Sequence, residues 1–103
     1  MLTQPEARRV ALVTLDIIQE MPGNAALDLV LIDALATESA LAWLFPFNTR
    51  EYMQTGDIGA LAVGVGPIVV NRQTGVPYVA PPLPMAQLVA QYESAGGEPY
   101  NWF

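Results

Sequence analysis

The sequence contains no cysteine and no histidine, and its four cationic side chains are all arginines. Without cysteine the chain has neither a disulfide framework nor a thiolate metal site, a usage that fits the cytoplasm. Without histidine, cysteine or lysine it has no conventional catalytic triad, thiolate nucleophile or Schiff-base amine. The acidic residues lie in no recognisable catalytic or metal-binding motif. The inventory predicts a protein that is not an enzyme and that uses no cofactor or metal.

Positive charge is scarce, because ten acidic residues face four basic ones and leave a net charge of −6. Nucleic acids and anionic membranes require a basic binding surface, so both are disfavoured as partners. The same balance favours solubility and attraction to a basic partner. No segment reaches the roughly 18 consecutive apolar residues of a membrane span. Arg8-Arg9 imitates an export signal, but Asp16 soon interrupts the apolar run that follows.

The chain has 103 residues, 52% of them hydrophobic, which suits one domain of ordinary size. We expect the domain to span residues 1–97 and residues 98–103 to form an aromatic tail. Thr3 and Glu6 form a capping box that predicts a helix, which ends at the breakers of residues 21–24. Its predicted buried face consists of Ala7, Val10, Ala11, Thr14, Ile17, Ile18 and Met21.

Two strands are expected next, over residues 29–36 and 41–47, joined by a polar turn at residues 37–39. Alternation in the second strand places Leu41, Trp43, Phe45 and Phe47 on one face, toward the core. Pro46 marks this strand as an edge or as the site of a bulge. We expect the two strands to form an antiparallel pair beneath the first helix.

Glycines and prolines divide the rest of the chain into short elements. Thr49 and Gly56 bound one helical turn, and Asp57 and Gly64 bound a second. Strands at 68–70 and 76–80 flank a hairpin loop at 71–75. Met85, Leu88, Val89 and Tyr92 form the apolar face of a helix that ends at Gly96-Gly97. The predicted fold is α+β: a four-stranded antiparallel sheet with one N-terminal and one C-terminal helix packed on it, and short helical turns between the second and third strands.

The motifs now resemble those of a known family. "WLF" at 43–45, "REYMQTGD" at 50–57, "GPIVV" at 66–70 and "NRQTG" at 71–75, followed by a helix that ends "LVAQY", are similar to the bacterial immunity protein 35 family. The resemblance covers residues 4 to 95. Val65-Gly66 replaces the asparagine-containing strand entry of the family, and Asn71 replaces its usual aspartate. The aromatic tail lies outside the resemblance.

The resemblance implies an immunity protein that binds and neutralises a cognate toxin of a polymorphic toxin or contact-dependent secretion system. Two alternatives stay open, a chaperone-like or adaptor domain and a small-molecule-binding domain that uses carboxylates. A buried pair of acids would support the second alternative. The sequence does not indicate the oligomeric state.

Loops fixed by a sheet are the usual place for recognition residues. We expect Glu38, Glu51 and Asp57 to be displayed together on such loops toward a toxin. The tail residues Tyr100, Trp102 and Phe103 either fold back onto the domain or contact a partner, because aromatic residues are enriched at interface centres. These candidate partner-binding residues are Glu38, Glu51, Asp57, Tyr100, Trp102 and Phe103.

Overall fold

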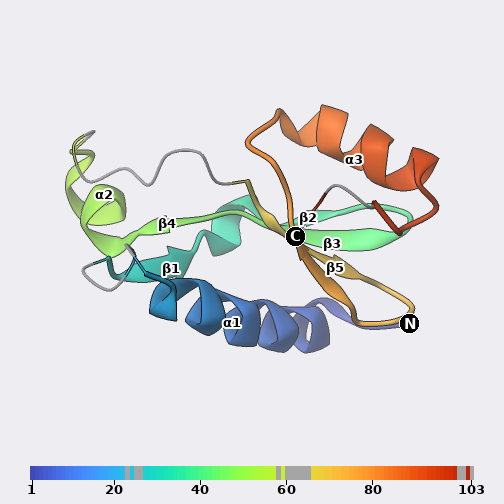
Figure 1. Ribbon diagram of the computed structural model, residues 1–103, viewed down its shortest axis with the longest axis horizontal. Helices are drawn as coiled ribbons and strands as arrows, with labels where there is room; N and C mark the ends of the chain where they lie inside the picture. The colour runs from blue at the N-terminus through green and yellow to red at the C-terminus, as the bar shows by residue number, and fades with distance from the viewer. Residues whose placement is uncertain (23, 25–26, 58, 60–65, 100–101, 103) are drawn as a thin grey trace.

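The computed structural model describes residues 1–22, 24, 27–57, 59, 66–99 and 102. The helices are α1 (Gln4–Glu20), α2 (Arg50–Thr55) and α3 (Met85–Ser94), and a short 3₁₀ helix, η1, covers Asp33–Leu35. The strands are β1 (Leu29–Leu31), β2 (Thr37–Glu38), β3 (Ala42–Phe45), β4 (Phe47–Thr49), β5 (Ile68–Asn71) and β6 (Pro77–Val79). The predicted α+β class, with a helix at each end of the chain, is confirmed (Figure 1).

Helix α1 begins where the capping box predicted. The Glu6 amide donates to the Thr3 hydroxyl at 3.4 Å, and the Thr3 amide donates back to the Glu6 carboxylate at 3.0 Å. These reciprocal bonds satisfy amides that have no partner inside the helix. They also lower the pKa of the Glu6 carboxyl, because the bonds from the backbone and side chain of Thr3 favour its charged form.

The buried face of α1 is rotated relative to the prediction. Ala7, Ala11, Leu15 and Ile18 are buried, whereas Ile17 and Met21 are exposed. The prediction was therefore wrong for Ile17 and Met21, and it missed Leu15. The two alanines carry nothing beyond Cβ, so the helix lies close to the sheet along the line they define. That line directs Leu15 inward and Ile17 outward.

The strands form two antiparallel sheets rather than one. A four-stranded sheet has the order β2-β3-β5-β6, and a separate two-stranded sheet joins β1 to β4. The expected pairing of residues 29–36 with 41–47 is corrected, because β1 pairs with the segment after Pro46 and β3 pairs with β2. Thr37 and Glu38, expected in a turn, form β2, and the chain turns at residues 39–41. Pro46 separates β3 from β4, since proline cannot donate to a ladder.

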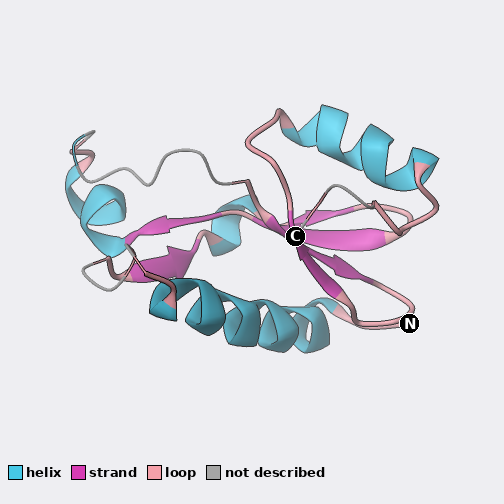
Figure 2. Ribbon diagram, in the orientation of Figure 1, coloured by secondary structure: helices cyan, strands magenta, loops and turns pink. Residues whose placement is uncertain are grey.

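Alternation along the strands separates two hydrophobic clusters, one on each face of the four-stranded sheet. Figure 2 shows α1 and α3 on opposite sides of the strands. The cluster facing α1 includes Phe45, Phe47, Ile68 and Val70, with Trp43 half-buried at its margin. The cluster facing α3 includes Ala42, Leu44, Val69, Leu88 and Tyr92. The predicted facing of Trp43, Phe45 and Phe47 is confirmed, but Leu41 contacts the α3 side because the chain turns there.

The β5–β6 hairpin and α3 follow the sequence prediction closely. The Asn71 side chain accepts hydrogen bonds from the amides of Gln73 and Thr74 at 2.9 and 3.0 Å. Gly75 closes the loop with a positive φ of 75°. Helix α3 buries Leu88 and Tyr92. Within the described chain, no helix has both the length and the apolar character needed to cross a membrane.

Candidate functional site

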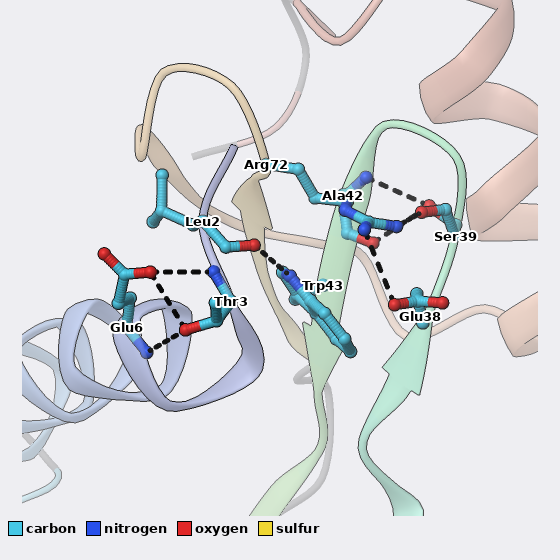
Figure 3. Close-up of polar contacts among 8 residues, drawn as sticks. All are labelled: Leu2, Thr3, Glu6, Glu38, Ser39, Ala42, Trp43 and Arg72. Atoms are coloured by element: carbon cyan, nitrogen blue, oxygen red, sulfur yellow. Dashed lines mark hydrogen bonds and ion pairs between the residues drawn. The ribbon is translucent and has the colours of Figure 1, made fainter.

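Glu38 lies in a cluster at one end of the four-stranded sheet. Arg72, in the β5–β6 hairpin, places its Nη2 3.5 Å from Glu38 Oε2 and donates from Nη1 to the Ser39 carbonyl at 2.7 Å (Figure 3). Its guanidinium lies 5.0 Å from the centre of the Trp43 ring, a cation–π distance. The indole N–H of Trp43 in turn donates to the Leu2 carbonyl at 3.0 Å. This cluster joins three segments that are distant in sequence.

The cluster changes what Glu38 offers to a partner. The Arg72 side chain is 19% exposed, so its charge is held mainly among Glu38, Ser39 and Trp43. The Glu38 side chain is 56% exposed and therefore remains accessible while paired. A partner that used Glu38 would have to share its carboxylate with Arg72. Tryptophan and arginine are enriched at protein interfaces. Here, however, Trp43 and Arg72 contact each other and neighbouring segments of the same chain, and these contacts stabilise the two hairpins.

Glu51 and Asp57 lie in and just after α2. Thr49 caps this helix by accepting from the Tyr52 amide at 3.1 Å, and Gly56 ends it with a φ of 69°. Asp57 then accepts from the Gly59 amide at 2.9 Å. The predicted helical turn is confirmed, whereas the second turn, expected over residues 57–64, lies largely outside the described residues. Both carboxylates are exposed, and within the described chain neither has an arginine partner.

The three candidate acids do not form one patch. Figure 1 shows α2 at one end of the long axis and the β2–β3 turn, next to Glu38, toward the other end. The principal extents are 36 × 26 × 24 Å, so this separation is large compared with the reach of a side chain. The structure brings Glu51 and Asp57 close along one short segment and leaves Glu38 apart. The expectation of a joint display is corrected.

Trp102 folds back onto the domain. Its side chain is only 7% exposed, and its ring stacks on Tyr92 at 5.5 Å with an interplanar angle of 29°. The indole N–H is buried and has no hydrogen-bond partner among the described residues. Trp102 therefore belongs to the hydrophobic cluster on the α3 side. The other two tail candidates, Tyr100 and Phe103, lie outside the described residues.

All ten aspartate and glutamate side chains lie in the described part, and all ten are exposed. The buried pair of acids that would support a carboxylate-based small-molecule site is therefore missing. The described residues also contain no group of three or more side chains suited to hold a metal ion.

Three of the four arginines form ion pairs with carboxylates of the same chain. Arg8 pairs with Asp33 at 2.8 Å, Arg50 with Asp28 at 2.7 Å, and Arg72 with Glu38. The hydrogen bond from Arg8 lowers the pKa of the Asp33 carboxyl. Sequence reasoning missed these pairs, because none of them joins near neighbours along the chain. The acidic residues left over dominate the charge that the surface presents.

The fold and its surfaces define a small α+β domain whose carboxylates all point outward. The family model of immunity protein 35 matches residues 6–94, and the chain therefore belongs to that family. The match spans every motif on which the sequence resemblance was based. Comparison with curated proteins finds no match, and comparison with solved structures finds none.

Proposed function

We propose that this protein is an immunity protein that binds the cognate toxin of a polymorphic toxin system and neutralises it in the cytoplasm of the producing cell. The observation that carries the proposal is the family match over residues 6–94. The absence of histidine, cysteine and lysine supports a role in binding rather than turnover. The acidic surface supports a toxin partner whose contact surface is basic, since complementary charge speeds association.

The candidate contact residues differ in whether their carboxylates are paired with an arginine of the same chain. Glu51 and Asp57 are the best placed, because both are exposed and have no arginine partner among the described residues. Glu38 is a weaker candidate, since it shares its charge with Arg72. Tyr100 and Phe103 stay proposals, and the stacking of Trp102 on Tyr92 favours a core role for that residue.

The proposal predicts specific protection in a growing bacterium. The toxin domain encoded beside this gene is expressed from an inducible promoter, with or without this protein in the same cell. We expect cells that express the toxin to grow only when this protein is also present. We expect no protection against a toxin domain of another system. A chaperone-like or adaptor role predicts binding to unfolded clients, and protection against both toxins would favour it. Death of the cells despite soluble, folded protein would contradict the immunity role.

A further inference from the structure

An exposed apolar stripe runs along the outer side of α1. It consists of Val13, Ile17 and Met21, which are 62%, 56% and 47% exposed. Val13 and Ile17 lie one turn apart on one side of the helix, and Met21, the C-cap residue, follows four positions later. Figure 1 shows that the opposite side of α1 covers the sheet, so this stripe faces away from the molecule. We call these three residues the α1 ridge.

The α1 ridge is bordered mainly by negative charge. Asp16 and Glu20 each follow a ridge residue by three positions, which makes them neighbours on the helix surface. Glu6 lies on the same side, two turns before Val13. The one cation on this outer side is Arg9, which makes no ion pair within the described chain. An apolar stripe with an acidic border fits an apolar surface surrounded by lysine or arginine.

A second copy of the chain is a poor occupant of this face. Two copies meeting through the α1 ridge would place the carboxylates of Glu6, Asp16 and Glu20 against a second set of the same groups. Each copy would contribute only Arg9 as compensation. Like charges facing each other across an interface cost several kcal/mol. The charge pattern therefore favours a basic partner over self-association.

We infer that the α1 ridge is the apolar contact through which this protein binds its toxin, and that its acidic border pairs with basic residues of the toxin. The inference rests on the proposed function and names its contact surface.

The apolar part is tested with the double variant Val13→Ser/Ile17→Ser, which leaves the net charge unchanged. Its matched control is Leu35→Ser/Val76→Ser, which removes two other exposed apolar side chains, 56% and 45% exposed. Binding to a catalytically inactivated toxin domain is measured by calorimetry. We expect the ridge variant to raise the Kd by about 30-fold or more, as loss of an interface hot spot does, and the control to stay within about threefold. Thermal melting confirms that both variants are folded.

The charged border is tested with Glu20→Lys against Glu93→Lys. Both glutamates are exposed and lie in the last turn of a helix, so the change in charge and its interaction with the helix dipole are matched. We expect Glu20→Lys to slow association with the toxin and to weaken the dependence of the association rate on salt. Glu93→Lys, on the α3 side, is expected to change both much less.

The outcomes separate the inference from the function on which it rests. If folded Val13→Ser/Ile17→Ser bound the toxin with the same Kd as the wild type, the inference would be overturned and the immunity role would stay intact. A wild-type dimer that the ridge variant converts to monomer without loss of toxin affinity would overturn it as well, since the ridge would then be a contact between copies. Failure of the wild-type protein to bind the toxin would overturn both.

Discussion

Replacing Gly66 with alanine is expected to lower the free energy of unfolding by about 3 kcal/mol, at the upper end of the range for overpacking. An added Cβ would lie 2.2 Å from the Pro81 carbonyl oxygen and 2.3 Å from that of Ala80. Both are backbone atoms, so no flexible side chain can move aside. Gly66 also donates to the Ala80 carbonyl at 3.1 Å, which holds the two segments together. Relief of the clash would break this contact.

The matched control is Gly56→Ala at the end of α2. That glycine has a positive φ of 69°, but in the described part of the chain no atom beyond its two chain neighbours lies within 4 Å of the added Cβ. We expect it to cost about 1–2 kcal/mol, the backbone penalty alone. Denaturant titration of both variants measures the difference. Equal stability of Gly66→Ala and the wild type would contradict the close backbone approach at the entry to β5.

Replacing Tyr92 with alanine is expected to cost about 3–5 kcal/mol, as for other large aromatic residues removed from a core. Tyr92 is 1% exposed, stacks on Trp102 and meets the edge of Tyr78 at a centroid distance of 6.0 Å. The variant would remove the ring of α3 on which Trp102 stacks. Denaturant unfolding measures the loss, and a rise in Trp102 accessibility to a fluorescence quencher should accompany it.

Tyr92→Phe isolates the hydroxyl, which accepts from the Asn71 side chain at 3.1 Å. Loss of this bond is expected to cost about 1 kcal/mol. Burial raises the pKa of the Tyr92 phenol, although the bond from Asn71 opposes the shift. Because the folded state holds this proton more tightly, stability should fall as the pH rises above about 10, the ordinary tyrosine value. The phenylalanine variant should lose less stability at alkaline pH than the wild type. A wild-type-like profile in Tyr92→Phe would contradict this assignment.

Local signals in the sequence were sufficient to predict several elements. The Thr3–Glu6 capping box, the cap and glycine that bound α2, and the Asn71–Gly75 loop each depend on residues only a few positions apart. In such motifs the hydrogen bonds that form the element are made by the motif itself. The family resemblance was carried by the same short motifs, which explains why it was visible without a structure.

Pairing between distant segments could not be predicted in the same way. The sequence predicted a hairpin of 29–36 with 41–47, but Pro46 divides the second segment between two sheets. The orientation of α1 was also ambiguous, because apolar residues lie nearly all round it. Ala7 and Ala11 decide which side approaches the sheet, and this choice exposes Ile17. The α1 ridge became apparent only when that orientation was known.

The candidate site was predictable only in part. Glu51 and Asp57 lie on the same short segment, so their proximity follows directly from the sequence. The partner of Glu38 is Arg72, more than thirty residues away, and no local pattern joins them. The position of Trp102 depends on how the chain returns after Gly96 and Gly97, both of which have a positive φ. Sequence composition alone did not distinguish a core role for this tail residue from an interface role.

The proposed immunity role is tested most directly by titrating purified protein into the active domain of a candidate toxin encoded beside its gene, while the toxin's own reaction is followed. We expect toxin activity to fall in proportion to the added protein and to be lost near equimolar amounts. The Val13→Ser/Ile17→Ser variant should require a clear excess for the same inhibition. Full toxin activity in the presence of excess folded wild-type protein would contradict the assignment as a toxin-neutralising partner.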